Sequence, residues 1–212
     1  ASGPTRGVLE RPSDKKHPKR IAFIQCVGSR DVHRGYAYCS AVCCMFATKE
    51  ALILKEHDPD IEVYIFYTEL KIYGKGFQEF VTRARDDRGV KYLRIRPGEV
   101  VEDPKTSDLA IWYEDTTVKM TKSIRVDLVV LCPALFPSAA SKELAGILGL
   151  ELDEYGFFKS KDFLFTPLDT NVPGIFICGY CQGAKDIPDS VAQASGAAAR
   201  AAEIIAQGGI SK

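Results

Sequence analysis

The chain has 212 residues, which is long enough for one substantial domain or two small ones. Its 28 basic residues balance 28 acidic ones, so electrostatics give no reason to expect nucleic acid or an anionic membrane as a partner. No apolar run approaches the roughly 20 residues that cross a bilayer, and the polar first residues lack the apolar core of a signal peptide. We therefore expect a soluble, cytoplasmic protein whose residues 1–20 are a linker or a cut point within a longer chain.

Strand and helix patterns alternate after this linker. The apolar run RIAFIQ (20–25) predicts a buried parallel strand, and a helix is expected from about Ser40 to His57. IEVYIFYT (61–68) is rich in β-branched and aromatic residues and predicts a second strand. A strand–loop–helix–strand unit of this kind favours a right-handed crossover and a parallel sheet.

The same α/β pattern continues to about residue 126. A helix is expected over 76–88 and a strand over 90–97, and the three short segments that follow predict an antiparallel meander. DLVVLCPAL (127–135) predicts a further buried strand.

The character of the chain changes after about residue 137. A short helix is expected from residue 141, and 170–180 is expected to be a loop that feeds a short strand. The last segment predicts a long alanine-rich helix that Asp189 or Ser190 caps and Gly208-Gly209 ends.

Four of the seven cysteines lie close together directly after the first predicted strand. They have the spacing C-x12-C-x3-C-C and are Cys26, Cys39, Cys43 and Cys44. In a reducing compartment such a group favours metal binding or redox chemistry over a disulfide framework. Four thiolates suit zinc or a [4Fe-4S] cluster, and the region has no C-x2-C knuckle of the kind that zinc ribbons use. We therefore favour the iron–sulfur cluster.

The expected helix start supports this interpretation. Cys39, Cys43 and Cys44 are expected around its first turn, where N–H groups and the positive end of the helix dipole stabilise an anionic centre. The alternative is that the cysteines are small buried hydrophobic residues, which suits Cys132 better than the group of four.

The cysteine loop also occupies the place of a nucleotide-binding turn. In a dinucleotide-binding domain the first strand-to-helix turn has the pattern G-x-G-x-x-G and holds the pyrophosphate. This turn has Gly28 and Gly35 but not that pattern, so we do not expect NAD to bind here.

Several stretches of the sequence resemble known redox proteins. TNVPGIFICGY (170–180) is similar to a C-terminal flavin-binding strand of flavoproteins of the thioredoxin reductase type, although Tyr180 replaces their acidic residue. RIAFIQCVGSRD, YCSAVCCMFATKEA and CQGAKDIPDSVAQASGAAARAA resemble, in the same order, the flavin-bearing subunit of heterodisulfide reductase. That subunit is an iron–sulfur flavoprotein, and the resemblance runs from about Gly3 to Ala206.

The resemblance implies an α/β fold in two parts. One part is a degenerate Rossmann-like, NAD-domain-like parallel sheet that holds the cysteine loop. The other is the C-terminal part of an FAD-domain-like unit. The organisation expected is a linker (1–20), a degenerate nucleotide-binding-like domain (21–126) and a C-terminal segment of an FAD-binding domain (127–212).

The resemblance also implies the cofactors and their residues. In that family the four cysteines hold a [4Fe-4S] cluster, which carries over to Cys26, Cys39, Cys43 and Cys44. The block that matches Gln182 to Gln193 lies against FAD, so the flavin-contact candidates are Gly179, Lys185, Asp186, Ile187, Val191 and Gln193. No catalytic residue is assigned. Lys185 is expected to stabilise a reduced flavin, with a simple turn-forming pair with Asp186 as the alternative.

The expected function is that of an electron-transfer module that relays single electrons between the cluster and an FAD. The family subunit is longer and has a first FAD-binding half, so the chain is expected to be a fragment or a split version with a partial flavin site. Its expected partners are that missing half, other subunits of a heterodisulfide-reductase-like complex and ferredoxin. The resemblance places this chemistry in electron bifurcation during methanogenesis, with no catalysis by the chain alone.

Two other functions stay open. The chain could be a structural or assembly module in which a metal only braces the fold. It could also be the remnant of a pyridine-nucleotide oxidoreductase that uses Cys178 and Cys181 as a dithiol. This pair ends a predicted strand instead of starting a helix, so packing or flavin proximity is the favoured role.

Overall fold

The computed structural model describes residues 5–208 and divides the chain into two compact units. The first unit contains the chain up to Val27 together with Cys43–Pro133, and the second contains Gly28–Val42 together with the chain from Ala134 onward. The cysteine loop therefore belongs in part to each unit.

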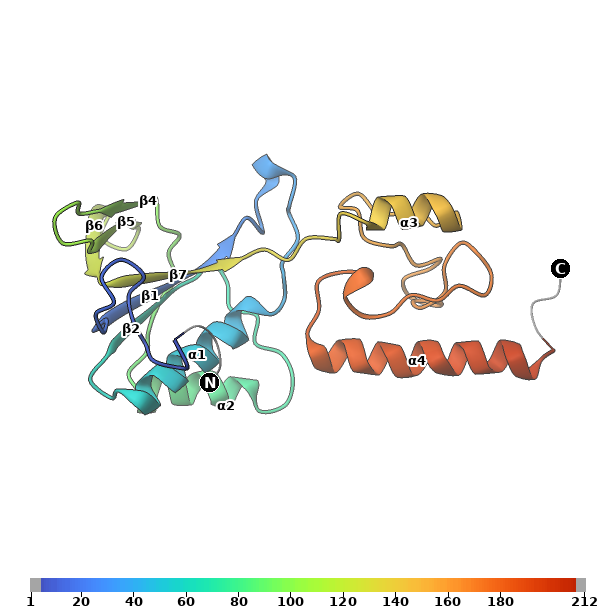
Figure 1. The fold of residues 1–212 in the computed structure, drawn as a ribbon, viewed down its shortest axis with the longest axis horizontal. Helices are drawn as coiled ribbons and strands as arrows, with labels where there is room; N and C mark the ends of the chain where they lie inside the picture. Colours follow the sequence, from blue (N-terminus) through green and yellow to red (C-terminus); the bar gives the residue numbers. More distant parts are fainter. Residues whose placement is uncertain (1–4, 209–212) are drawn as a thin grey trace. The chain divides into compact units, whose positions relative to one another are not determined.

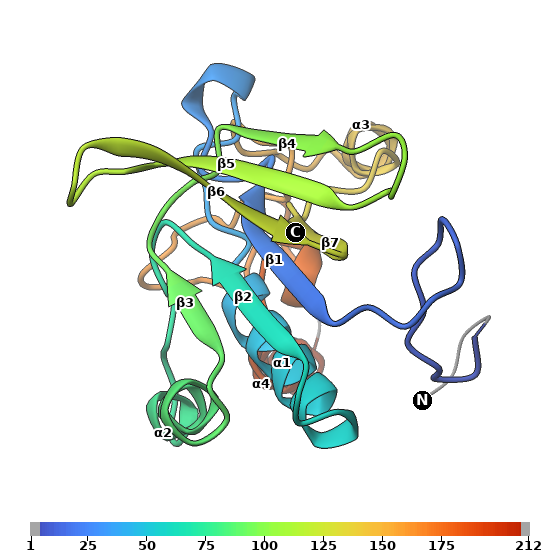
Figure 2. The same cartoon turned by 90° about the vertical axis from the view of Figure 1, so that its left-hand side faces the viewer.

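The first unit is built on a parallel sheet of four strands in the order β3-β2-β1-β7 (Figures 1 and 2). The strands are β1 (Arg20–Val27), β2 (Glu62–Phe66), β3 (Lys91–Leu93) and β7 (Leu128–Pro133). Strand β1 lies in the middle and is buried along most of its length because both of its edges are paired and both faces are covered. This parallel sheet confirms the predicted fold class.

Two helices cover one face of this sheet (Figure 2). Helix α1 (Cys43–His57) buries small residues such as Ala47 and Ala51 against the sheet, which lets its backbone approach closely. Helix α2 (Phe77–Thr82) continues into the π-helical turn Arg83–Asp87, as expected for the apolar pattern of this segment.

An antiparallel sheet covers the other face of the parallel sheet (Figure 2). Its strands are β4 (Glu99–Glu102), β5 (Leu109–Asp115) and β6 (Met120–Val126), in the order β4-β5-β6. Ile111, Tyr113 and Val126 form one apolar core with Ala22 of β1 and Phe66 of β2. The predicted meander is therefore confirmed. Its apolar side chains bury this face of the parallel sheet.

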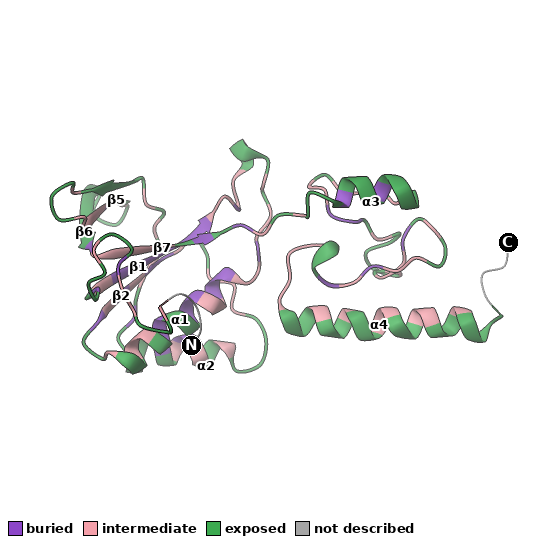
Figure 3. Ribbon diagram, viewed as in Figure 1, coloured by how far each residue is buried: buried purple, intermediate pink, exposed green. Residues whose placement is uncertain are grey.

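The second unit has two longer helices and little regular sheet. Helix α3 (Ser141–Leu148) and helix α4 (Ile187–Ala206) are joined by loops that contain isolated β-bridges, such as the one between Asp169 and Phe176. A small core of Ala145, Phe158 and Ile177 holds α3 to these loops. No residue of α4 is buried within the described chain (Figure 3).

Three local predictions were wrong, each for a physical reason. Helix α1 begins at Cys43 and not at Ser40, because Ala41 has a left-handed backbone (φ 63°) that a helix does not accept. The strand expected before Cys178 is a single bridge, because no neighbouring strand is present within residues 5–208 to extend it. Asp186 caps α4 in place of Asp189 or Ser190, and it accepts a hydrogen bond from the Asp189 N–H at 2.8 Å.

Gly209 lies outside the described residues, so the expected Gly208-Gly209 helix end is described only at Gly208. In the part of the chain that the structure describes, no helix is long and apolar enough to cross a membrane.

One partly buried carboxylate joins the starts of β1 and β7. Oδ2 of Asp127 accepts hydrogen bonds from the N–H groups of Lys19 (2.7 Å) and Arg20 (2.9 Å) just before β7 begins. We expect Asp127→Ala to lower the free energy of unfolding by about 1–3 kcal/mol, because two backbone donors lose their charged acceptor. Asp86→Ala, which removes an exposed pair with Arg85, is the control and should change stability little. Urea unfolding of the variants measures both effects, and equal stability of the two would contradict this role.

Candidate functional site

Cys26 lies on a strained bulge at the end of β1. The pairing of β1 with β7 shifts register between Ile24 and Val27, and Cys26 has a left-handed backbone with φ 59°. A residue other than glycine pays a free-energy cost in this conformation, of order 1–3 kcal/mol for strained backbone of this kind. Bulges are frequent beside functional sites because they redirect a side chain. The strain at Cys26 therefore indicates a constraint beyond folding.

Cys43 and Cys44 form the start of α1, where backbone N–H groups have no helical partner. Cys44 Sγ accepts a hydrogen bond from the Lys71 N–H at 3.4 Å, and it also lies 3.7 Å from the carbonyl oxygen of Glu69. Gln25 Nε2 donates a hydrogen bond to the carbonyl oxygen of Cys43 at 3.3 Å, which joins the end of β1 to the helix start. Both thiols are buried.

Cys132 brings a fourth buried thiol into the first unit. It lies on β7 and is fully shielded from solvent. Desolvation raises the pKa of Cys132 to about 12, and the nearby thiols of Cys43, Cys44 and Cys26 contribute to the rise. The three cysteines of this unit that the spacing singled out therefore lie within electrostatic reach of Cys132. Sequence reasoning treated Cys132 as a packing residue, and no spacing signal links it to the others.

Cys39 belongs to the second unit and precedes α1 by four residues. Its Sγ accepts a hydrogen bond from the Ala41 N–H at 3.3 Å, and the left-handed backbone of Ala41 belongs to this tight turn. Hydrogen bonds from backbone N–H groups stabilise negative charge on sulfur. Two of the four cysteines, Cys39 and Cys44, thus have an amide donor at the sulfur.

These cysteines supply thiolate ligands of the kind that soft metals prefer, but their side chains are not arranged around a single ion position. Within residues 5–208, no group of three or more His, Cys, Asp or Glu side chains is arranged to hold a metal ion. In the same part of the chain, no cysteine forms a disulfide. Soft thiolates and N–H donors to sulfur are what an iron–sulfur cluster requires, so the donor set fits such a group.

The flavin-contact candidates fall into two groups in the structure. Gln182 Oε1 accepts hydrogen bonds from Lys185 Nζ at 3.0 Å and from Gln193 Nε2 at 2.7 Å. Gln193 Oε1 in turn accepts a hydrogen bond from the Gly179 N–H at 2.7 Å. The structure therefore brings three candidates together around Gln182, a residue that the sequence reasoning did not choose.

The other candidates serve the start of α4 or face outward. Asp186 caps the helix, and the hydrogen bond of Lys185 goes to Gln182 instead of to Asp186. The side chains of Ile187 and Val191 are largely exposed and take no part in the network. Gly179 has φ 67°, and a Cβ there would lie 3.3 Å from Ser190, so the turn before α4 needs a glycine.

Lys185 has a lowered pKa, so its positive charge is less favoured than that of an exposed lysine. Partial burial lowers its pKa, while nearby Asp189 and Cys181 oppose that shift. A cation in these surroundings gains from an anionic ligand, which would offset its desolvation.

Cys178 and Cys181 lack the properties of a redox dithiol. The Cys181 thiol donates a hydrogen bond to the carbonyl oxygen of Cys178 at 3.1 Å, and desolvation raises its pKa. A reactive pair needs a thiol with a lowered pKa. The dithiol function therefore has no support in this geometry.

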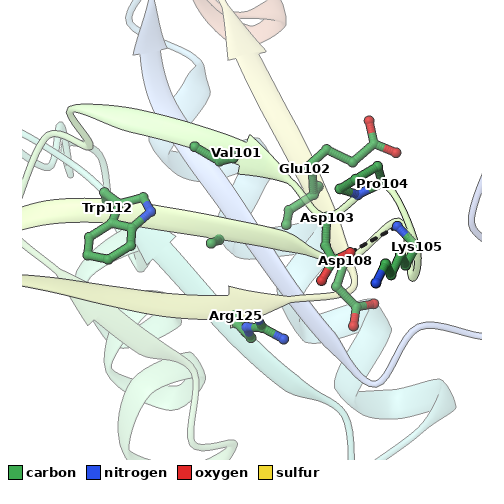
Figure 4. Close-up of a pocket in the computed structure, with 10 residues that line it drawn as sticks. Val101, Glu102, Asp103, Pro104, Lys105, Asp108, Trp112 and Arg125 are labelled. Atoms are coloured by element: carbon green, nitrogen blue, oxygen red, sulfur yellow. Dashed lines mark hydrogen bonds between the residues drawn. The ribbon is translucent and has the colours of Figure 1, made fainter.

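A hollow of about 460 Å³ lies on the antiparallel sheet, away from the cysteines in sequence (Figure 4). Its wall includes Trp112, Lys105 and Arg125, and Asp103 accepts a hydrogen bond from the Lys105 N–H at 2.9 Å. It contains none of the candidate residues.

Comparison with known sequences identifies close relatives. The chain is 50% identical to an iron–sulfur subunit of CoB–CoM heterodisulfide reductase from Methanocaldococcus jannaschii, over 98% of its length and 32% of the relative. It is 49% identical to the corresponding subunit of the H2/formate:CoB–CoM heterodisulfide,ferredoxin reductase of Methanococcus maripaludis, with the same coverage. The chain thus spans about a third of the length of the curated relatives it matches. No protein-family model matches it.

Solved structures support the fold. Thioredoxin reductase of Lactococcus lactis superposes with a TM-score of 0.55 over 89% of this chain and 53% of that protein, at 22% identity. Thioredoxin reductase of T. acidophilum gives a TM-score of 0.52 over 87% and 50%, at 20% identity. At such identities the similarity concerns the Rossmann-like fold alone.

The raised pKa of Cys132 predicts a pH dependence of stability. Between pH 9, the ordinary value of the thiol, and about 12, the unfolded chain has lost the Cys132 proton while the folded chain keeps it. Unfolding then releases a proton, so stability is full below pH 9 and falls as the pH rises above it. We expect Cys132→Ala to weaken this fall in the metal-free, reduced protein. Denaturant unfolding at pH 7.5, 9 and 10.5 measures it, and parallel curves for both proteins would contradict the expectation.

Proposed function

Because the chain is homologous over nearly all of its length to a segment of the iron–sulfur subunit of heterodisulfide reductase, we propose that it is an electron-transfer module. It holds one [4Fe-4S] cluster through Cys26, Cys39, Cys43 and Cys44, and it provides part of an FAD site in residues 179–193. The cluster supplies single-electron transfer, and the flavin supplies the exchange between single electrons and electron pairs.

The amide donors at Cys39 and Cys44 sulfur are the observation that supports the cluster best. They stabilise the thiolate over the thiol and withdraw negative charge from sulfur, which raises the reduction potential of a bound centre. The strained bulge at Cys26 and the helix start at Cys43 add to this support, because strained backbone and helix N-termini are both frequent at functional sites.

The flavin part of the proposal rests on Gln182, Lys185 and Gln193. Their hydrogen bonds fix the side chains of Lys185 and Gln193 before a ligand binds, which lowers the entropy cost of binding. The N-terminus of α4, which Asp186 caps, would bring the positive end of the helix dipole to an electron-rich ring. Lys185 would place its positive charge beside that ring.

In this proposal the rest of the flavin site comes from another segment of polypeptide. The chain is about a third as long as its relatives, and α4 buries none of its residues within the described chain. We propose that the missing FAD-binding half covers part of this helix and that the chain alone is not a catalyst. The proposed partners are ferredoxin and the other subunits of a heterodisulfide-reductase-like complex. Both relatives are named as a subunit of such a reductase, and the name of the second includes ferredoxin. The assembly would then take part in electron bifurcation in methanogenesis, in the cytoplasm.

Metal analysis tests the cluster. We expect anaerobically purified or reconstituted protein to contain about four irons and four sulfides per chain and to give an EPR signal after dithionite reduction. Changing Cys26, Cys39, Cys43 or Cys44 to Ala should lower the iron content and weaken that signal. Cys132→Ser, which changes another buried thiol of the first unit, is the matched control and should keep the iron. One zinc per chain would contradict electron transfer and favour a bracing metal.

Flavin retention tests the split site. The chain alone should retain FAD substoichiometrically, whereas co-expression with the remaining segments of a longer relative should bring it to about one FAD per chain. Gln182→Leu should lower the FAD content of the co-expressed protein, because Lys185 and Gln193 both lose their shared acceptor. Gln207→Leu, at the far end of α4, is the control. Full FAD retention by the chain alone would contradict the need for a second half.

A further inference from the structure

A cluster of aromatic rings lies within the second unit, directly beside Cys39 in the sequence. Tyr38 is its centre: its ring lies 4.8 Å from Tyr155, 5.6 Å from Phe157 and 6.3 Å from Tyr36, measured between centroids. All three pairs have an edge-to-face arrangement, which is a favourable geometry for aromatic rings.

The cluster reaches the flavin-contact segment. The Phe157 ring lies 5.9 Å from the ring of Tyr180, which precedes Gln182 by two residues. Tyr36 packs on Phe136 at 4.6 Å, and the Tyr180 hydroxyl donates a hydrogen bond to the carbonyl oxygen of Phe136. The rings thus join four stretches that are distant in the sequence: the cysteine loop, residues 134–136, residues 155–157 and the turn before α4.

Hydrogen bonds hold the same loop at both sides of Cys39. The Tyr38 hydroxyl donates to the carbonyl oxygen of Leu135 at 2.6 Å, and the Leu135 N–H donates to Ser40 Oγ at 2.9 Å. Ser40 is fully buried. Leu135 therefore uses both of its backbone groups to hold the residues before and after Cys39.

We propose that Tyr38 is the positioning residue for Cys39, which it holds in place through the aromatic cluster and Leu135. This inference deepens the proposed function and rests on it, since it assigns a residue that fixes one sulfur ligand relative to the flavin-contact turn of the same unit. The reason is local: Cys39 has no helix or strand of its own. The hydrogen bonds of Tyr38 and Ser40 to Leu135 hold its backbone on either side, and the Ala41 N–H donates to its Sγ within the same turn.

The hydroxyl and the ring of Tyr38 have separable roles. Tyr38→Phe keeps the three ring pairs and removes the hydrogen bond to Leu135. Tyr38→Leu removes both. The matched control is Phe163→Leu, because Phe163 is an aromatic residue of the same unit that is 79% exposed.

The first test needs no metal. Reduced, metal-free protein is pulsed with N-ethylmaleimide, and mass spectrometry gives the alkylation rate of each cysteine. We expect Tyr38→Leu to raise the rate at Cys39 by roughly tenfold or more, as the loss of its three ring pairs implies, with a smaller rise in Tyr38→Phe. Cys43 and Cys44 in the first unit should react at unchanged rates. An unchanged rate at Cys39 in both variants would overturn the proposal.

The second test follows the cluster. In reconstituted protein, Tyr38→Phe should shift the midpoint potential and the EPR g-values of the reduced centre, whereas Phe163→Leu should leave both unchanged. A cluster with unaltered potential and g-values in Tyr38→Phe and Tyr38→Leu would also overturn the proposal. If Tyr38→Leu does not fold by circular dichroism, Tyr38→Phe decides both tests. Wild-type protein that binds no iron would overturn the proposed function, while the alkylation rates would still decide the role of Tyr38.

Discussion

The central constraint in this structure is the burial of β1 and its abrupt end. Six successive residues of the strand are buried, because β2 and β7 pair with its two edges and the helices and the antiparallel sheet cover its faces. The bulge at Gln25 and Cys26 then stops the regular pairing, and the chain leaves the first unit after Val27. The helix that starts at Cys43 returns to the same sheet, so β1 fixes where three of the four cysteines lie.

Much of the first unit could be predicted from the sequence, because buried parallel strands and an amphipathic meander have strong local patterns. The apolar runs at β1 and β7 and the β-branched residues of β2 each identified a real strand. The start of α1 could not be predicted, since it depends on the left-handed backbone of Ala41 and on the contact between Ser40 and Leu135, 95 residues away. Such a tertiary contact leaves no periodic signal in the sequence.

The candidate site shows the same limit. Spacing and resemblance pointed to the four cysteines and to the block after Gly179. Within that block they did not single out Gln182, whose role is to connect Lys185 with Gln193. They did not point to Tyr38 either, which contacts Leu135 and Phe157, both more than 90 positions further on. Residues of this kind are found only from the structure. Their residue types are common, and their roles come from the hydrogen bonds and ring contacts that the fold gives them.

The division of the chain between two units limits how it could be cut. Residues 28–42 belong with the chain after Ala134, while Cys43–Pro133 belongs with the chain before Gly28. A single break after Pro133 would give a second unit without the loop that contains Tyr38 and Cys39, and a break after Val27 would take β1 from its sheet. Each unit is therefore made of two segments of the chain that alternate with those of the other, and neither can be expressed complete as one uninterrupted piece of this sequence.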